Sequence, residues 1–240
     1  MQIFLNHEAF GNAGAKSSSF RSSYPYTLPH LKREGGTYFV TFRLFGTLPT
    51  ELVVKLKRER EIILEQALAA KRPLTWQERE ELFQWYSRRV DGYLDAGHGE
   101  CFLRQPEVAG MIAGAFRYFD GLRYDLRAWV IMPNHVHMVV QPMPEQTLSE
   151  ILHSWKSYTA KEANKILKRP GCRFWQKESY DHLVRNDVDL ARCCTYTTMN
   201  PVKAGLCDRP EDWVWSSLYQ KPVETKQDAS SPAAGTATLR

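Results

Sequence analysis

The spacing of apolar residues changes along the chain between the alternation typical of strands and the longer period typical of helices. Residues 36–45 are rich in β-branched and aromatic side chains and predict a strand. Two short apolar runs at 124–132 and 135–141 are hinged at Met132-Pro133-Asn134 and predict a pair of adjacent strands. Residues 180–185 predict one more strand.

Amphipathic segments fill the intervals between these strands. Thr50 is suited to cap the first helix, and Thr147 with Glu150 matches the pattern of a capping box before the fourth. Asn186 or Asp187 is expected to cap the last helix. The predicted helices are Glu51 to about Ala70, Thr75 to about Leu94, a helix starting at Pro106, Thr147 to about Leu167, and Asp187 to about Asn200. The sequence Asn200-Pro201 predicts a break, followed by a single turn that Gly205 closes.

Strands separated by helices, with a tight strand pair in the middle, predict an α+β fold with an antiparallel or mixed sheet. No glycine-rich phosphate loop follows a predicted strand, which argues against a doubly wound nucleotide-binding fold. The composition divides the chain into a flexible arm at 1–23, one domain at 24–220 with a helical insertion at 51–94, and a disordered tail at 221–240.

Composition narrows the class of protein only a little. Hydrophobic residues make up 43% of the 240 positions, enough for one substantial core, and no apolar run is long enough for a transmembrane helix. Five cysteines without a Cys-x-x-Cys pair suggest reduced thiols rather than disulfides, and the N-terminus does not resemble a signal peptide. We therefore expect a cytoplasmic protein with no membrane partner. A net charge of +5 permits a polyanionic partner.

The strand predicted at 135–141 carries the first candidate chemistry. His135 and His137 are two residues apart, so their imidazoles share one face of a strand while Val136, Met138 and Val140 line the other. Two neighbouring imidazoles can bind a transition metal if another part of the chain supplies a third donor. The alternative is a half-buried strand whose polar face carries two histidines without a ligand.

The last predicted helix offers that third donor. Tyr196 and Asn200 lie four residues apart, so the phenol and the amide face the same way. The Asn200 carbonyl oxygen is an acceptable ligand for Mg²⁺ or Mn²⁺ beside two imidazoles. If this helix covers the histidine face, a metal there could polarise a phosphodiester for attack by the Tyr196 oxygen. The sequence identifies no certain base for the tyrosine.

Each of these residues also has an ordinary structural explanation. Asn200 could serve only as a helix N-cap before Pro201, and Tyr196 could be a half-buried aromatic residue on a core-facing stripe. His182 could assist phosphate chemistry or could simply be hydrogen-bonded within its strand. The lysines of the helix at 147–167 could form a solvated face or flank a DNA path. The predicted DNA-binding residues are Arg43, Lys156, Lys161 and Lys203.

Several motifs in this order resemble the single-tyrosine HUH transposases, and most closely their REP-associated branch. The matching blocks are Arg123 to Val140, Phe174-Trp175-Gln176, Tyr180 to Arg185, and Tyr196 to Leu206. The resemblance covers roughly residues 35–219. It implies a ferredoxin-like antiparallel sheet flanked by helices, a divalent metal on the histidine pair, and a helical tyrosine that nicks single-stranded DNA through a 5′-phosphotyrosine.

Carried onto this sequence, the resemblance implies that His135, His137 and Asn200 bind Mg²⁺ or Mn²⁺ and that Tyr196 is the nucleophile. The implied substrates are short palindromic repeats that fold into hairpins, and the implied state is a monomer, with a dimer as the alternative. Thr197 stands where isoleucine is common in relatives, and the insertion at 51–94 exceeds the minimal family core. A catalytically silent repeat-binding protein and a water-using metallonuclease are the alternative functions; relaxases and replication initiators differ in motif order.

Overall fold

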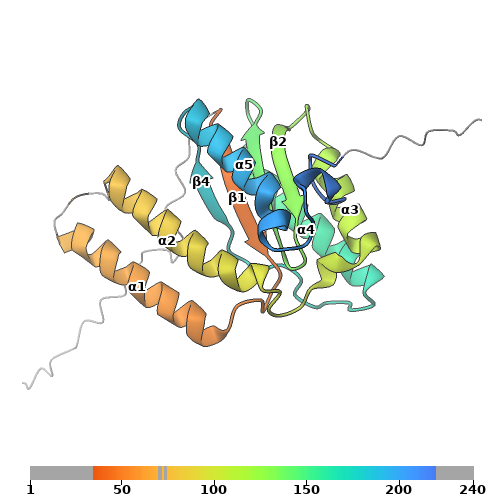
Figure 1. Cartoon of the computed structure of the whole chain (residues 1–240), viewed down its shortest axis with the longest axis horizontal. Coiled ribbons are helices and arrows are strands. Elements are labelled where there is room, and N and C mark those ends of the chain that lie inside the picture. The colour runs from red at the N-terminus through yellow and green to blue at the C-terminus, as the bar shows by residue number, and fades with distance from the viewer. Residues whose placement is uncertain (1–34, 70–71, 73–74, 220–240) are drawn as a thin grey trace, which may run out of the picture.

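A four-stranded antiparallel sheet forms the centre of the protein, for which a computed structural model describes residues 35–69, 72 and 75–219 (Figure 1). The strands are β1 (Tyr38–Arg43), β2 (Tyr124–Ile131), β3 (His135–Pro142) and β4 (Tyr180–Leu183), in the order β2-β3-β1-β4. The arm predicted at 1–23 and the tail predicted at 221–240 lie outside the described residues.

The order of these strands confirms the expected α+β, ferredoxin-like fold. β2 and β3 form a hairpin, β1 pairs with β3, and β4 pairs with β1, all antiparallel. Each strand of the hairpin therefore runs parallel to a strand two places away, which requires a helical crossover between them. The helix before β2 and the helix after β3 supply these crossovers, giving the β-α-β-β-α-β arrangement.

The helices follow the predicted segments closely. Within the described residues they are α1 (Thr50–Ala69), α2 (Trp76–Asp95), α3 (Pro106–Arg117), α4 (Leu148–Ile166) and α5 (Asp187–Lys203), with short 3-10 helices at Phe102–Arg104 and Pro210–Asp212. Thr147 and Glu150 form the predicted capping box, and Pro106 occupies the first turn of α3. Asn186 caps α5 by accepting a hydrogen bond from the Asp189 amide.

The sequence prediction was wrong at the end of α5. Instead of breaking at Asn200-Pro201, the helix continues through Pro201 to Lys203. A proline removes one backbone N–H and so one hydrogen bond to the preceding turn. Because Pro201 lies two residues before the end of α5, the other backbone hydrogen bonds of this last turn can still form. Gly205 closes the helix with a positive φ of 67°, as predicted. Asn200 is therefore an interior helical residue and not an N-cap.

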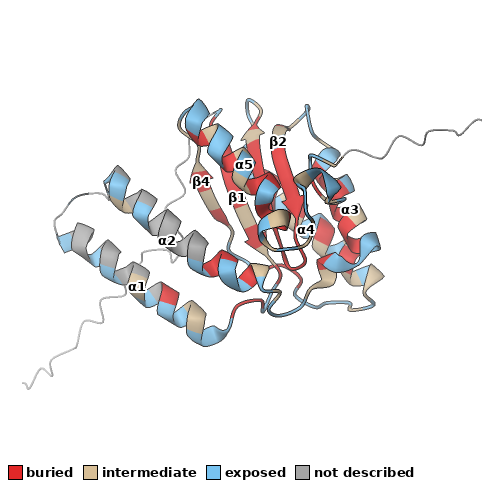
Figure 2. Ribbon diagram, in the orientation of Figure 1, coloured by how far each residue is buried: buried red, intermediate tan, exposed pale blue. Residues whose placement is uncertain are grey.

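The two faces of the sheet have different coverings (Figures 1 and 2). Val136, Met138 and Val140 pack with α3 and α4 in the main core, as the alternation predicts. The opposite face packs against α5 through a smaller cluster that includes Phe39 and Val139. Because α5 lies on the face that carries the histidines, the sheet separates the main core from the candidate site.

The helices α1 and α2 form a hairpin that projects from the side of the sheet, with many exposed positions (Figure 2). Its small apolar cluster contains Leu48, Leu56, Val90 and Leu94, close to where the hairpin joins the sheet. In Figure 1 the last turns of α2 reach the end of α5. The insertion predicted at 51–94 therefore touches the same face as the candidate site.

The segment after α5 returns to the edge of the sheet. The indole N–H of Trp213 donates to the Ile131 carbonyl oxygen, and the Ile131 amide donates to the Trp215 carbonyl oxygen.

All five cysteines are free, as expected from their number and spacing. Among the described residues, no helix is both long enough and apolar enough to cross a membrane.

A buried hydrogen-bond chain in the main core gives a test of the fold. Tyr124 donates to the Phe116 carbonyl oxygen and accepts from the Trp155 indole. Replacing Tyr124 with Phe leaves the Phe116 carbonyl and the Trp155 indole N–H buried without a hydrogen-bond partner. This substitution should lower the free energy of unfolding by about 1–3 kcal/mol. Urea denaturation measures this change. Tyr118→Phe, at an exposed position, should change stability by less than about 0.5 kcal/mol, and equal effects of the two variants would contradict the prediction.

Candidate active site

His135 and His137 lie side by side beneath α5 and are both fully buried. Their Nε2 atoms are 3.0 Å apart, so the two rings converge on one point. The register of β1 against β3 places Arg43 opposite His135 and Thr41 opposite His137 on the same face. The alternation of the strand alone predicts this shared face, whereas the convergence of the nitrogen atoms is seen only in the three-dimensional structure.

The outer nitrogen of each ring has its own partner. His135 Nδ1 is 2.7 Å from the Asn134 side-chain oxygen, which can only accept, so the proton of a neutral His135 lies on Nδ1 and Nε2 keeps its lone pair. His137 Nδ1 is 2.7 Å from the Thr41 hydroxyl, which can donate or accept. Such partners fix the orientation of metal-binding imidazoles. Sequence reasoning missed both, although Asn134 lies next to His135 and could have been recognised.

Tyr196 reaches the histidine pair from α5. Its ring packs edge-on against His137, with 5.5 Å between the ring centroids and an interplanar angle of 81°. Phe39, which stacks on His137, makes a second edge contact with the Tyr196 ring. Thr197 turns away from the site into the packing beneath the helix, where its hydroxyl donates to the Cys193 carbonyl oxygen. The predicted covering of the histidine face by the tyrosine helix is therefore present.

Asn200 lies one turn beyond Tyr196 and is fully buried. Neither its side-chain oxygen nor its side-chain nitrogen has a hydrogen-bond partner among the described residues. A buried amide without partners costs roughly 1–3 kcal/mol. Since the helix does not begin here, the capping explanation for Asn200 is excluded, and a ligand for its oxygen is the physical alternative.

Two acidic residues that sequence reasoning did not identify complete the surroundings. Asp91 and Asp95 lie four residues apart near the end of α2, and the Tyr196 hydroxyl donates a hydrogen bond to Asp91 Oδ2. Asp95 Oδ1 lies 3.8 Å from His135 Nε2 and is buried without a hydrogen-bond partner among the described residues. Their spacing in the sequence is that of any helix face, so no sequence signal marked them.

Burial sets the charge states of the site. It lowers the pKa of His135 to about 3 and also lowers that of His137, whose pKa is reduced further by His135 and Lys203. Burial raises the pKa of Asp91 to about 7 and that of Asp95 to about 6. Burial and the neighbouring Asp91 together raise the pKa of Tyr196 far above its usual value. The imidazoles are therefore neutral metal donors at pH 7, and the phenol needs activation.

The predicted DNA-binding residues fall into two groups. Lys203 holds its ammonium 5.1 Å from the centre of the Tyr196 ring, and Arg43 lies on the histidine face, where it donates to the Thr47 hydroxyl. Lys156 and Lys161 belong to α4, on the other face of the sheet. Lys156 donates to the Lys177 carbonyl oxygen and the Ser179 hydroxyl, and burial lowers its pKa to about 8.

The donor set fits a divalent cation. Two donors at about 2.1 Å from one ion and at right angles to each other are about 3.0 Å apart, which agrees with the spacing of the two Nε2 atoms. The Asn200 side chain lies one turn beyond Tyr196 on the helix that covers these rings, and it is buried with no hydrogen-bond partner among the described residues. Neutral imidazoles and an amide oxygen suit Mn²⁺ well and Mg²⁺ acceptably.

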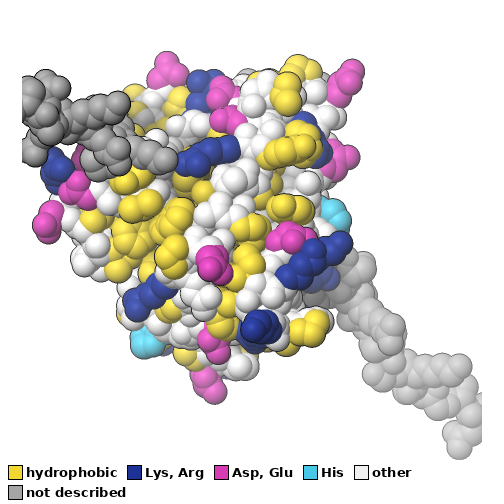
Figure 3. All heavy atoms as spheres, turned by 90° about the vertical axis from the view of Figure 1, so that its right-hand side faces the viewer, with side chains coloured by type: hydrophobic (Ala, Val, Ile, Leu, Met, Phe, Trp, Pro, Cys, Tyr) yellow, Lys and Arg dark blue, Asp and Glu magenta, His cyan; other side chains and the backbone are white. Residues whose placement is uncertain are grey.

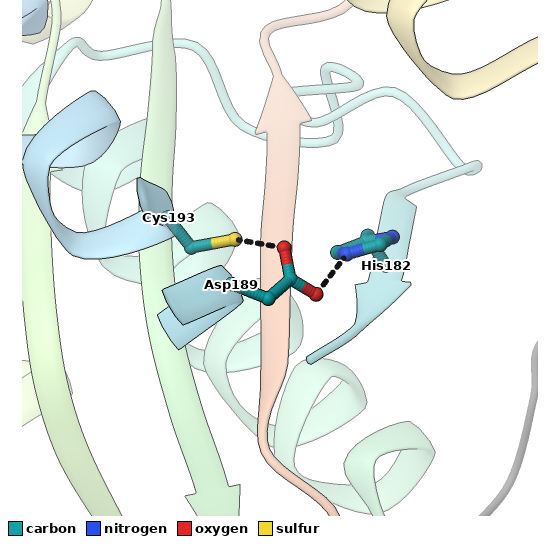
Figure 4. A group of neighbouring side chains, drawn as sticks. All are labelled: His182, Asp189 and Cys193. Atoms are coloured by element: carbon teal, nitrogen blue, oxygen red, sulfur yellow. Dashed lines mark hydrogen bonds and ion pairs between the residues drawn. The ribbon is translucent and has the colours of Figure 1, made fainter. Parts of the chain in front are cut away.

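A second cluster has metal-ligand composition but a different role (Figure 4). His182, Asp189 and Cys193 lie close together where β4 meets the first turns of α5. Both Asp189 oxygens already accept strong hydrogen bonds, one from His182 Nε2 at 2.9 Å and one from the Arg192 guanidinium at 2.7 Å. The Arg185 amide also donates to this carboxylate. The cluster therefore anchors the start of α5, which agrees with the hydrogen-bonded interpretation of His182.

Comparison with known proteins shows which class of protein this part of the chain resembles. The sequence pattern of the family described as "Transposase IS200 like" matches residues 114–197, which include the histidine pair and Tyr196 but neither Asn200 nor α2. The resemblance to IS200-like transposases seen in the motifs is thereby confirmed for this part of the chain.

The similar proteins point to one branch of that class. A protein of Haemophilus influenzae, provisionally named a REP-associated tyrosine transposase, is 30% identical over 107 residues, covering 40% of this chain and 60% of its own. The REP-associated tyrosine transposase of Escherichia coli K12 is 25% identical over 119 residues, covering 47% of this chain and 68% of its own. This chain thus spans 60% and 68% of the length of these two relatives, and its resemblance to the REP-associated branch is confirmed.

One solved structure is also similar. It is described as a REP-associated tyrosine transposase bound to a REP hairpin, and it shares 18% identity with a TM-score of 0.41, covering 89% of this chain and all of its own.

Metal binding tests the choice between the two clusters. At a hundred times its dissociation constant, Mn²⁺ should stabilise the full chain by about 2.7 kcal/mol against urea. His137→Ala should remove this increment because one of the converging nitrogen atoms is lost. Cys193→Ala should retain it, since Cys193 belongs to the cluster that anchors α5. An increment that survives His137→Ala and disappears in Cys193→Ala would reverse the assignment.

Proposed function

We propose that this protein is a metal-dependent DNA transposase that nicks single-stranded DNA at hairpin-forming repeats and rejoins it through a 5′-phosphotyrosine. The observation that carries the proposal is the direct packing of the Tyr196 ring on His137, which brings a nucleophile to a buried metal-type donor set. The match of residues 114–197 to IS200-like transposases supports the class of reaction. The REP-associated relatives support hairpin repeats as the substrate.

The chain's residues divide the chemistry among them. His135, His137 and Asn200 would hold Mg²⁺ or Mn²⁺, which polarises the scissile phosphodiester when bound. The Tyr196 oxygen forms a bond to phosphorus as the bond from phosphorus to the 3′ oxygen breaks. The departing 3′ oxygen takes a proton from water, and the tyrosine gives its proton to a base. Attack by a different 3′ hydroxyl reverses these steps and rejoins the strands, so the phosphodiester energy is conserved.

Positive charge near the tyrosine supports a path for the DNA. Lys203, next to the Tyr196 ring, and Arg43, on the same sheet face, are proposed to contact phosphates close to the cut. Lys161 is exposed on α4 and, together with Lys156, stays a prediction for the far side of the sheet. Figure 3 shows the side near α3, where acidic and basic side chains are interspersed with apolar ones, so that face does not favour a polyanion.

The active site is proposed to be complete within one chain, since α5 packs its tyrosine on the sheet of the same molecule. This arrangement supports a monomer over an exchange of the tyrosine helix between subunits. A cytoplasmic location, where DNA and reducing conditions occur together, agrees with five free cysteines.

Labelled hairpin DNA from the flanks of the protein's own gene tests the proposal. With Mn²⁺, a strand labelled at its 3′ end should become attached to the protein and stay attached during denaturing electrophoresis. The 5′-labelled fragment should run free and end in a 3′ hydroxyl that a polymerase can extend. Tyr196→Phe should abolish the adduct because the attacking oxygen is removed, and His137→Ala should abolish it because metal is lost.

Tyr158→Phe is the matched control, because Tyr158 is exposed on α4 and away from the site. It should form the adduct at the normal rate. Cleavage that persists in Tyr196→Phe without an adduct would indicate a water-using nuclease. Tight hairpin binding with neither cleavage nor adduct would indicate a repeat-binding protein.

A further inference from the structure

The end of α2 presents two carboxylates to the candidate active site. Asp91 is only 6% exposed, and both residues lie outside the family match at 114–197. Other acidic residues of the same helix behave differently: Glu81 is exposed, and Glu78 serves in the capping box. Asp95 is half-buried, but its Oδ1 atom is buried, and carboxylate oxygens kept from water are costly unless a cation or a hydrogen-bond donor faces each of them.

The first carboxylate has such a donor. Asp91 Oδ2 accepts the hydrogen bond of the Tyr196 hydroxyl, across 105 positions of the sequence. This contact places a carboxylate oxygen within proton-transfer distance of the atom that must lose its proton to attack phosphorus.

The second carboxylate lacks a donor. Asp95 Oδ1 and the two polar atoms of Asn200 are the buried side-chain atoms that remain without a hydrogen-bond partner among the described residues. Asp95 Oδ1 lies near His135, and Asn200 lies one turn beyond Tyr196 on α5. His135 Nε2 lies 3.8 Å from Asp95 Oδ1, and a cation bound beside them would satisfy both of these acceptors.

We propose that α2 is part of the catalytic machinery, with Asp91 as the base that takes the proton of Tyr196 and Asp95 as a fourth donor to the cation. This inference rests on the proposed function for Asp91 and on the metal site alone for Asp95. It gives the helical insertion at 51–94 a chemical role. The chain would thus hold its cation with two imidazoles, one amide and one carboxylate.

The proposed proton transfer is balanced over the full reaction. During nicking, the proton passes from the Tyr196 oxygen to Asp91 as the new bond to phosphorus forms. During rejoining, Asp91 returns it to the phenolate oxygen as the phosphotyrosine bond breaks. Lys203 faces both carboxylates and Tyr196, so its ammonium offsets part of their negative charge throughout.

Single-turnover adduct formation tests the role of Asp91. Asp91→Asn keeps the size of the side chain but removes the base, and it should slow adduct formation by about 10²- to 10⁴-fold. Hairpin affinity and Mn²⁺ affinity should stay within about twofold of the wild-type values, since Asp91 contacts neither. Asp91→Glu should recover part of the rate. Glu81→Gln, at an exposed carboxylate of the same helix, should react normally.

Replacing Tyr196 with a more acidic tyrosine analogue distinguishes two roles of Asp91: a base that takes the proton, or a residue that only positions the tyrosine. A fluorinated tyrosine at position 196 needs less help to ionise, so the penalty of Asp91→Asn should shrink at least about tenfold in that background. An undiminished penalty, or an Asp91→Asn protein that reacts at the wild-type rate, would overturn the role of Asp91. A wild-type protein that forms no adduct would instead overturn the proposed function, and the role of Asp91 with it.

Calorimetric titration with Mn²⁺ in the absence of DNA tests the role of Asp95 independently of the reaction. In full-length protein carrying Tyr196→Phe, Asp95→Asn should weaken Mn²⁺ binding by at least about tenfold, because changes to groups around a metal cost this much even without direct contact. Glu81→Gln should leave the affinity unchanged. Equal Mn²⁺ affinity in the Asp95→Asn protein would overturn the role of Asp95. If His137→Ala still abolished Mn²⁺ binding in that case, the proposed site of His135, His137 and Asn200 would stand without Asp95.

Discussion

Two imidazoles face each other in the interior of this protein, and the rest of the site depends on keeping them neutral. Their Nε2 atoms are 3.0 Å apart and are enclosed by α5, so a proton on both rings would place two positive charges in a medium that cannot solvate them. Asn134 fixes the proton of His135 on the outer nitrogen. The lone pairs that remain, with the Asn200 and Asp95 oxygens that have no hydrogen-bond partner among the described residues, make the site complementary to a divalent cation.

The sheet has two separate tasks because its faces are covered differently. Residues that point toward α3 and α4 build the main core, while those that point toward α5 form the site and a smaller apolar cluster. The His182–Asp189 pair anchors the start of α5, and the turn at Gly205 ends it. Because both ends of this helix are fixed, Tyr196 meets His137 at a defined depth, and Asn200 is held one turn further along. The reaction that we propose needs such fixed geometry, since an in-line attack tolerates little displacement.

The hairpin α1–α2 extends the common architecture with a part that the family match does not include. The outer positions whose burial the structure describes are mostly exposed, whereas the end of α2 approaches α5. An insertion between β1 and α3 can reach the site because β1 lies in the middle of the sheet and ends beside the histidines. The apolar cluster of Leu48, Leu56, Val90 and Leu94 holds the hairpin near its base and so positions Asp91 and Asp95.

The sequence alone determined the elements and much of the site. Strand alternation placed His135 and His137 on one face, the Thr147 capping box fixed the start of α4, and the helical spacing aligned Tyr196 with Asn200. These are local properties, set by the two periods of the backbone. The sequence failed at Asn200-Pro201, where a common helix-start pattern lies inside a helix. Only the tertiary structure decided which side of the sheet α5 covers, that Thr41 meets His137, and that Asp91 and Asp95 reach the tyrosine and the histidines. Packing between distant segments decides such contacts, and the spacing of two acids on one helix is the same whether they face water or an active site.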